Sequence, residues 1–292
     1  MSKQKAQPIV YLNGHYVVLQ NACISVLDRG FIFGDGVYEV IPAYGRNLFR
    51  LSHHLDRLNN SLNAIRLKNP HTPEHWQQAI KQVIEKNSYD DQSVYLQVTR
   101  GVAPRDHTFP DQGSPTVLIM TSPLEGQATE IVKHGIKAVT LQDNRWQHCH
   151  IKSISLLPNV LLRQEALVKG AQEAILLRDG QATEGSASNL FIILDDCLIT
   201  PPKGPLLLPG VTRDLVVEIA REQELCLKEQ LVSEPDLFRA VEIWLTSSTK
   251  EILPVTRLND KIVGNGKPGP YWRQMINTYQ AYKQALRSGH YQ

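Results

Sequence analysis

Segments with the hydrophobic periodicity of helices are mixed along this chain with short apolar segments typical of strands, without a strict strand–helix–strand rhythm. Apolar residues recur every three or four positions in one predicted helix, at Leu51, Leu55, Leu58, Leu62 and Ile65. Asn13-Gly14 between two apolar runs predicts a β-hairpin. Further helices are expected over 73–86, 158–169 and 212–223, and strands over 94–99, 116–120, 136–141, 174–177, 190–194 and 241–246. This mixture favours an α+β fold.

The chain of 292 residues is long enough for two compact domains. A polar stretch over 121–129, which carries Pro123 and Gly126, marks the expected boundary. The predicted organisation is a small N-terminal α/β domain, a linker, a larger C-terminal domain and a tail, over 1–121, 122–128, 129–286 and 287–292.

Charge and composition exclude several classes of protein. The formal net charge of +2, with no basic run longer than two residues, argues against nucleic acid or a membrane surface as a partner. Residues 1–8 lack a secretory signal, and the longest apolar runs are far too short to span a bilayer. Four widely spaced cysteines without a CxxC motif suit buried thiols in a reducing compartment: Cys23, Cys149, Cys197 and Cys226. We therefore expect a soluble cytoplasmic protein.

Common motifs of nucleotide, serine-hydrolase and zinc chemistry are absent from the sequence: GxGxxG after a strand, GxxxxGK[ST], GxSxG and HExxH. His148 and His150 would share one face of a strand, but no further ligand lies nearby in sequence. We expect no metal site.

Two segments favour a buried reactive site. Lys152 has apolar neighbours, and desolvation lowers the pKa of an amine as a nucleophilic lysine requires. On this evidence alone, a snorkelling lysine at a strand end is the favoured interpretation. Glu184 precedes small residues and an apolar strand, so a flat ligand can approach the backbone there. A protonated pyridine nitrogen would suit a buried Glu184, but a capping glutamate in a turn is the ordinary alternative.

Two hydroxyl-bearing segments suit a phosphate group. The helix expected from Thr212 begins after Leu208-Pro209-Gly210-Val211, so its free N–H groups and the Thr212 hydroxyl form a possible anion seat. A second cluster, over 246–249, follows the strand at 241–246. Each cluster also has an ordinary explanation as a cap or turn.

Taken together, these segments resemble the class IV (fold type IV) aminotransferases that depend on pyridoxal 5'-phosphate (PLP). The likeness is carried by 184–191, 198–200 and 208–213, and it extends from Asp28-Arg29-Gly30 and 33–40 to Ser247-Ser248. The resemblance implies a two-domain fold with the cofactor between the domains.

Within that class, the segment from 97 to 107 is most similar to the D-amino acid aminotransferase (D-alanine transaminase) subfamily. The resemblance implies that Arg105 and His107 bind the substrate α-carboxylate in the partner subunit of a homodimer, with Tyr38 assisting from its own subunit. A planar guanidinium and an imidazole suit such a clamp. Without the resemblance, both residues would be interpreted as ordinary loop residues.

The resemblance also implies roles for the other site residues. Lys152 would bind PLP covalently and move the proton between Cα and C4′, while Glu184 would keep the pyridine nitrogen protonated. Arg57, preferred over Arg50 and Arg66, would bind the phosphate. The remaining expected cofactor contacts are Val211, Thr212, Ser248 and, near the ring or the carboxylate side, Ser186 with Ala187.

Three positions depart from the family pattern: Pro42, Ala187 and Ser248. Pro42 lies in an expected strand on the substrate side, and its missing N–H confines it to an edge or a bulge. The side-chain preference of the pocket is therefore open, while the carboxylate clamp is intact.

The expected reaction is a ping-pong transfer of the amino group from D-alanine, or a similar D-amino acid, to 2-oxoglutarate, giving pyruvate and D-glutamate. The alternatives are a branched-chain L-aminotransferase, an (R)-amine transaminase, an aminodeoxychorismate lyase or a non-catalytic homologue. Arg105 and His107 argue against the other enzymes, and the joint presence of Lys152 and Glu184 argues against a non-catalytic protein.

Overall fold

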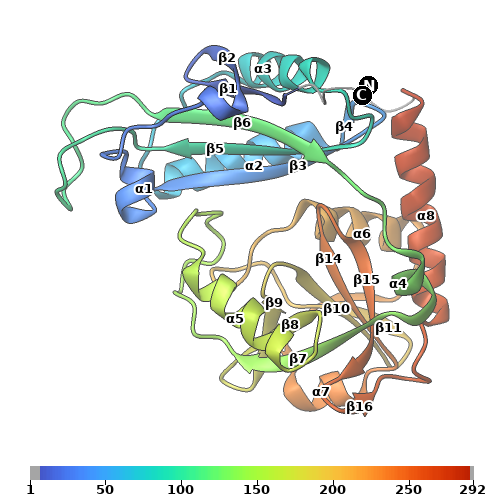
Figure 1. The fold of residues 1–292 in the computed structure, drawn as a ribbon. Helices are drawn as coiled ribbons and strands as arrows, with labels where there is room; N and C mark the ends of the chain where they lie inside the picture. Colours follow the sequence, from blue (N-terminus) through green and yellow to red (C-terminus); the bar gives the residue numbers. More distant parts are fainter. Residues whose placement is uncertain (1–6, 290–292) are drawn as a thin grey trace. The chain divides into compact units, whose positions relative to one another are not determined.

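The computed structural model describes residues 7–289, which divide into two compact units (Figure 1). The first unit comprises 7–125, 151–155 and 285–289, and the second comprises 126–150 and 156–284. The division after Glu125 falls inside the interval expected for the linker. The short segment that carries Lys152 groups with the first unit, whereas continuous boundaries assign it to the second domain. Residues 1–6 of the expected first domain and 290–292 of the expected tail lie outside the described residues.

The first unit is built on a six-stranded sheet, all of whose pairings are antiparallel, in the order β2-β1-β6-β5-β3-β4. The expected hairpin is confirmed: Asn13 and Gly14 join the first two strands with positive φ angles of 50° and 94°, as a tight hairpin turn requires. The strands are β1 (Ile9–Leu12), β2 (His15–Val18), β3 (Gly36–Tyr44), β4 (Asn47–Leu48), β5 (Gln92–Thr99) and β6 (Thr116–Pro123). The helices are η1 (Leu19–Asn21), α1 (Arg29–Phe33), α2 (Leu51–Ala64) and α3 (Pro73–Lys86).

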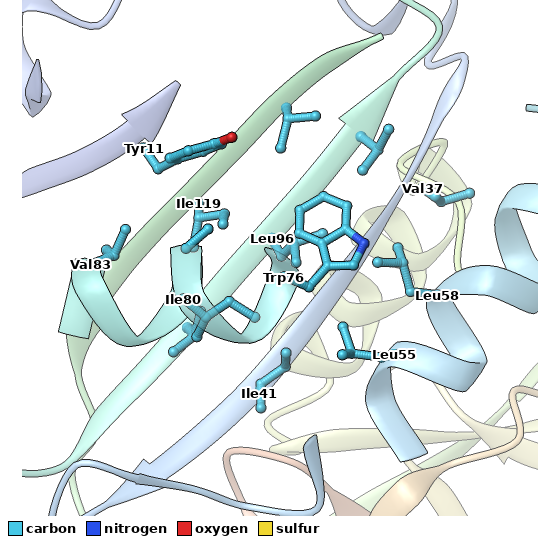
Figure 2. Packing of buried hydrophobic residues seen from close by; sticks show 14 of the residues in the cluster. Tyr11, Val37, Ile41, Leu55, Leu58, Trp76, Ile80, Val83, Leu96 and Ile119 are labelled. Atoms are coloured by element: carbon cyan, nitrogen blue, oxygen red, sulfur yellow. The ribbon is translucent and has the colours of Figure 1, made fainter. Parts of the chain in front are cut away.

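One hydrophobic core joins α2 and α3 to this sheet (Figure 2). The predicted stripe of α2 supplies Leu55, Leu58 and Leu62, which pack with Trp76 and Ile80 of α3. Alternate residues of the strands complete the cluster, because successive side chains of a strand point to opposite faces. Burying each large apolar side chain contributes roughly 1.5–3 kcal/mol.

The second unit contains a ten-stranded mixed sheet in the order β12-β11-β10-β14-β15-β7-β8-β9-β13, with β16 paired to β15. Its strands are β7 (Ile136–Gln142), β8 (Glu173–Arg178), β9 (Gln181–Gly185), β10 (Asn189–Leu194), β11 (Cys197–Thr200), β12 (Leu227–Glu229), β13 (Val232–Ser233), β14 (Glu242–Ser247), β15 (Glu251–Leu258) and β16 (Lys261–Ile262). Its helices are α4 (Thr129–His134), α5 (Leu157–Val168), α6 (Val211–Glu222), α7 (Glu234–Arg239) and α8 (Pro270–Arg287), the last of which ends among residues of the first unit. Mixed pairing and irregular helix order confirm the α+β class.

The longest helix, α8, was not among the expected elements, although its signal is present in the sequence. Trp272, Met275, Ile276 and Tyr279 recur at helical spacing, and all four are buried. Within residues 7–289, no helix combines the length and the apolar character needed to cross a bilayer.

Pro42 lies inside a continuous strand. The register of β3 with β5 runs without a bulge from Gly36 opposite Thr99 to Ala43, and Pro42 faces Ser93. The Pro42 carbonyl accepts the Phe49 N–H on the side away from β5. A residue's N and C=O point to the same side of a strand, so the missing N–H also falls on the outer side, where β4 pairs only with Ala43 and Tyr44.

The cysteines differ from expectation. Cys197 of β11 and Cys226 form a disulfide with their Cα atoms 4.7 Å apart, and Cys23 is exposed. The prediction of buried free thiols is therefore wrong for these three residues, and only Cys149 fits it. The 29-residue separation hid the pair because β11 and β12 are parallel neighbours, and their pairing brings these distant parts of the chain together.

Candidate active site

The backbone of Lys152 is hydrogen-bonded to β3 and α2 of the first unit. Its carbonyl accepts the Tyr38 N–H at 2.9 Å, and its own N–H donates to the Ser61 hydroxyl at 3.1 Å. The half-buried side chain places Nζ 4.1 Å from the centroid of the Tyr38 ring. The structure thus brings together Lys152 and Tyr38, two of the predicted site residues.

Tyr38 lies on the face of the sheet opposite the hydrophobic core. Its neighbours on β3, Val37 and Glu39, point to the buried side, while its ring stacks on Tyr95 with centroids 5.6 Å apart. Burial, with a contribution from Tyr38, raises the pKa of Tyr95 to about 12, so Tyr95 is a neutral hydrogen-bond donor to Gln97. Lys152 therefore lies against the Tyr38 ring, which in turn stacks on Tyr95.

Arg57, the predicted phosphate ligand, lies in a buried ion pair with Glu39. Arg57 Nε donates to one carboxylate oxygen at 2.8 Å and a terminal nitrogen to the other at 2.7 Å. Burial alone would raise the pKa of Glu39, but Arg57 lowers it to about 2. His54 Nδ1 lies 2.8 Å from the same carboxylate, and burial lowers the pKa of His54, so a neutral imidazole donates to Glu39. The sequence analysis missed Glu39 and His54.

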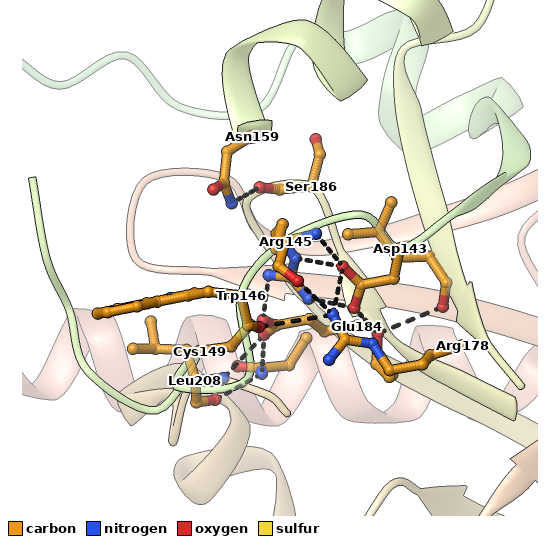
Figure 3. Close-up of polar contacts among 12 residues, drawn as sticks. Asp143, Arg145, Trp146, Cys149, Asn159, Arg178, Glu184, Ser186 and Leu208 are labelled. Atoms are coloured by element: carbon orange, nitrogen blue, oxygen red, sulfur yellow. Dashed lines mark hydrogen bonds and ion pairs between the residues drawn. The ribbon is translucent and has the colours of Figure 1, made fainter. Parts of the chain in front are cut away.

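Glu184 of β9 lies in a buried polar network of the second unit (Figure 3). Its Oε1 accepts Arg145 at 2.6 Å, and its Oε2 accepts the Leu208 N–H at 3.0 Å and Asn189 Nδ2 at 3.2 Å. Arg145 also donates from two nitrogens to Asp143, at 2.9 and 3.0 Å. Arg145 is thus a cationic partner of Glu184 that the sequence analysis did not name.

Burial has the largest effect on the acidity of Glu184. It raises the pKa of Glu184 to about 7 even though Arg145 and the Leu208 N–H oppose the rise. Burial also disfavours the charged form of Arg145, but Asp143 and Glu184 outweigh it and raise the pKa of Arg145. Arg145 therefore stays charged, and Glu184 ionises near neutral pH.

The expected phosphate seat also lies in the second unit. Val211 begins α6, and no side chain caps this end of the helix, whose first-turn N–H groups lack partners within the helix itself. Within the described part of the second unit, the buried hydroxyl oxygens of Ser188, Thr212 and Thr246 have no hydrogen-bond partner. A Cβ on Gly210 would lie 1.9 Å from Asn189 Oδ1, so glycine is required between this helix end and the Glu184 network.

Ser248 and Ser186 take different places in the second unit. Ser248 is half-buried in the turn after β14. The Ser186 hydroxyl donates to the buried Glu173 carboxylate, and its carbonyl accepts Asn159 Nδ2 at 2.8 Å. Ala187, next in the chain, is exposed.

Arg105 and His107 lie on an exposed loop of the first unit, on either side of Asp106. The His107 ring is 5.3 Å from the Phe33 ring, and the Arg105 guanidinium carbon is 5.5 Å from the same ring. The structure therefore gathers the predicted clamp pair around Phe33.

Comparison with known proteins identifies the family. The sequence matches the amino-transferase class IV family over residues 36–258, a range that includes every predicted site residue. This chain belongs to the class IV aminotransferases. Members of this family use PLP as their cofactor.

Named relatives of this class IV aminotransferase include two D-alanine aminotransferases. That of Bacillus licheniformis is 37% identical over 93% of this chain and 95% of its own length, and that of Staphylococcus haemolyticus is 34% identical over 96% and 99%. Among solved structures, the branched-chain amino acid aminotransferase of Escherichia coli has a TM-score of 0.88 at 27% identity, covering 94% of both chains. That of Thermoproteus uzoniensis, solved with norvaline, has a TM-score of 0.84 at 26% identity, covering 96% of this chain and 95% of its own.

The residues present fit the family's cofactor. The three unpartnered hydroxyls and the uncapped start of α6 supply donors of the kind that a phosphate accepts. Glu184 supplies a buried carboxylate of the kind that a protonated ring nitrogen requires. Within residues 7–289, no group of three histidine, cysteine, aspartate or glutamate side chains is arranged to hold a metal ion.

Proposed function

We propose that this class IV aminotransferase transfers the amino group of D-alanine, or a similar D-amino acid, to 2-oxoglutarate, giving pyruvate and D-glutamate in two half-reactions. The observation that carries the proposal is the Arg105–His107 pair gathered on Phe33, where it presents cationic and hydrogen-bonding groups to solvent. The 34–37% identity to D-alanine aminotransferases supports the same substrate class.

The proposed cofactor contacts follow from the chemistry of each side chain. PLP supplies an electron sink for the Cα–H bond of the substrate. Glu184 accepts a hydrogen bond from the protonated ring nitrogen, and Arg145 and Leu208 hold the Glu184 carboxylate in place. Val211 and Thr212 bind the phosphate at the start of α6. Ser248 and Arg57 are further phosphate ligands in this proposal, and Ser186 lies near the ring.

Lys152 binds the cofactor covalently and moves the proton between Cα and C4′ in this proposal. A lysine acts as a base in its neutral form. The hydrogen bond from Lys152 N to Ser61 and the contact with Tyr38 fix where the amine lies. The stereochemistry follows from the face on which Nζ delivers the proton.

We also propose that the enzyme is a cytoplasmic homodimer in which Arg105 and His107 bind the α-carboxylate of the substrate held by the partner subunit. The exposure of both side chains supports this part of the proposal, because side chains that bind the substrate of the partner subunit must extend from the surface of their own subunit. Tyr38 assists from the subunit that holds the substrate.

A panel of amino donors tests the proposal. Purified enzyme with PLP and 2-oxoglutarate should release pyruvate from D-alanine, little keto acid from L-leucine or L-alanine, and little acetophenone from (R)-1-phenylethylamine. Turnover of L-leucine without D-alanine would overturn the proposal in favour of a branched-chain L-aminotransferase. Turnover of the amine alone would favour an (R)-amine transaminase.

Borohydride reduction of the holoenzyme tests the role of Lys152. Mass spectrometry of the digested protein should find the phosphopyridoxyl group on the peptide with Lys152, and Lys152→Ala should remain unlabelled. Label on the half-buried Lys250 instead would contradict the assignment.

A further inference from the structure

The loop that carries Arg105 and His107 is long and irregular. It occupies 100–115, between the end of β5 and the start of β6, and contains no helix or strand. Loops longer than about 12–15 residues without secondary structure are uncommon and are usually either functional or disordered. Binding a carboxylate requires a fixed geometry, so the contacts that hold this loop bear directly on the clamp.

Asp28 closes the base of this loop. Its Oδ2 accepts the hydroxyls of Thr99, the last residue of β5, at 3.1 Å and Thr116, the first residue of β6, at 2.6 Å. Its Oδ1 accepts the Gly30 N–H at 2.8 Å and so caps α1. The buried Asp28 carboxylate thus links both ends of the loop to the start of α1.

Arg29 holds the tip of the loop. Its Nη1 donates to the carbonyls of Asp106, at 2.6 Å, and Thr108, at 3.2 Å, which lie on either side of His107. Its Nε donates to Asp35 at 2.8 Å. Arg29 is only 3% exposed, so it is sequestered from solvent while it fixes the backbone beside the clamp.

Asp35 fixes Arg29 and the start of the loop together. Arg100 donates to both Asp35 oxygens, at 2.8 and 3.0 Å, and its guanidinium carbon lies 3.8 Å from the centroid of Phe109. Burial would raise the pKa of Asp35, but Arg100 and Arg29 lower it below its ordinary value. Asp35 is therefore ionised at neutral pH and bonds to both guanidinium groups.

Phe33 completes the arrangement. The Arg29 guanidinium carbon lies 4.9 Å from the centroid of the Phe33 ring, which also contacts Arg105 and His107. The helix that places Arg29 therefore also places the ring beneath the clamp. Glycine is required after Arg29, because a Cβ on Gly30 would lie 2.3 Å from Thr99 Cγ2.

We propose that Arg29, fixed by Asp35, is the positioning residue that sets the geometry of the Arg105–His107 clamp and thereby the enzyme's selectivity for donors with an α-carboxylate. This inference rests on the proposed function. Arg29 acts through the backbone on both sides of His107 and has no role as a ligand itself. The three residues of the Asp28-Arg29-Gly30 motif have different roles. Asp28 binds the base of the loop, Arg29 binds its tip, and Gly30 permits the close approach of α1 to Thr99 of β5.

Arginine is required at this position because one planar group serves three acceptors in fixed directions: the Asp35 carboxylate and two carbonyls. A lysine ammonium is a compact charge on a flexible stem and does not reproduce the fixed, planar arrangement of N–H donors in a guanidinium. Arg29→Lys is therefore expected to behave more like Arg29→Ala than like the native enzyme, while keeping the charge.

Hydrogen exchange of the holoenzyme tests the positioning independently of activity. The amides of Asp106 and Thr108 are hydrogen-bonded within the loop. Arg29→Ala and Arg29→Lys should raise their exchange rates about 10-fold or more as the loop opens locally. Arg105→Ala and the exposed control Arg46→Ala should leave these rates unchanged. Unchanged exchange in both Arg29 variants would overturn the proposal.

Kinetics of the same proteins test the consequence for substrate. Arg29→Lys should raise the KM for D-alanine about 30-fold with kcat changed less than about threefold, because small misplacements can cost up to about 100-fold. Added guanidine should restore part of the KM of Arg29→Ala. Faster amide exchange at Asp106 and Thr108 together with an unchanged KM for D-alanine would overturn the proposal.

Two further results separate the possible failures. If Arg29→Ala destabilises the whole first unit, exchange will also rise in β3 and β5, and Phe33→Leu then provides the test, with a KM increase of about 5-fold or more expected from the lost ring contact. Failure of the native enzyme to use D-alanine, with the exchange results intact, would reject the proposed substrate and leave Arg29 as the residue that holds the loop.

Discussion

Each unit of this enzyme contains a network of arginine and carboxylate side chains, and the two networks are centred on opposite kinds of group. In the first unit, one carboxylate, Asp35, is shared by two guanidinium groups, Arg29 and Arg100. In the second, the guanidinium of Arg145 is shared by two carboxylates, Asp143 and Glu184, and Arg178 pairs with Asp143 as well, at 3.2 Å. The first network leaves guanidinium donors for backbone carbonyls, and the second leaves one Glu184 oxygen for N–H donors outside the ion pairs.

The difference decides what each network holds. The spare donors of Arg29 and Arg100 are taken by backbone carbonyls, among them those of Asp106 and Ile65, so this network fixes a loop. The spare oxygen of Glu184 accepts the Leu208 N–H, and its carboxylate remains the group suited to a cationic ring nitrogen. Similar ion-pair chemistry therefore positions the backbone in one unit and sets the acidity of a side chain in the other.

Removing the shared group of the second network should have the largest effect. Arg145→Met leaves two carboxylates buried without their common cation, at a cost of about 3–5 kcal/mol in the free energy of unfolding at pH 8. Urea denaturation measures the loss. The matched double variant Arg145→Met with Glu184→Gln should recover part of it, because it removes the buried charge that loses its only ion-pair partner among the described residues, whereas Asp143 keeps Arg178. No recovery would show that Arg145 acts by packing.

The pH dependence of stability should distinguish the two networks in the cofactor-free protein. Below pH 4.5 Glu184 is protonated in both the folded and unfolded states, and between about 4.5 and 7 only the unfolded chain releases the proton. Stability should therefore fall by about 3 kcal/mol across this window as the pH rises, and stay level above it.

Two variants isolate these contributions. Relative to Glu184→Gln, which cannot ionise, the native protein should lose stability in urea denaturation as the pH rises from 5 to 7. The lowered pKa of Asp35 has the opposite sign: its contribution is present above the unfolded value and is lost only in acid. Relative to Asp35→Asn, the native protein should thus show no slope over the same range. A slope for Asp35 would contradict the contrast.

Removing the shared group of the first network should have the smallest effect. Asp35→Asn keeps an acceptor for one guanidinium, and both arginines keep their backbone carbonyls, so a loss of about 2 kcal/mol is expected. Urea denaturation beside Arg145→Met at pH 8 provides the comparison. A cost above that of Arg145→Met would show that the two networks do not differ as described.

Local patterns predicted much of the fold. The leucine stripe over 51–65 and the Asn13-Gly14 turn depend on periodicity and backbone preference, which neighbouring residues set, and the structure confirms both. The Cys197–Cys226 disulfide depends on the pairing of two distant strands, which spacing does not reveal. The C-terminal helix had a readable pattern and was nonetheless missed.

The candidate site shows the same division. Lys152 and Glu184 were found because each belongs to a local motif with small or apolar neighbours. Arg145 was missed because nothing in its own segment indicates that it contacts Glu184, 39 residues away in the chain. Glu39 offered a weak signal, a carboxylate on the buried face of a strand, which requires a buried cation such as Arg57.

The sequence by itself determined the α+β class, the class IV resemblance and the residues proposed to react, because these depend on patterns and motifs contiguous in the chain. Only the tertiary structure decided which partner each buried arginine binds: Arg57 binds Glu39, Arg145 binds Glu184, and Arg29 binds the carbonyls beside His107. The physical reason is that burial makes an unpaired charge costly, and the partner that meets this cost is selected by proximity in space.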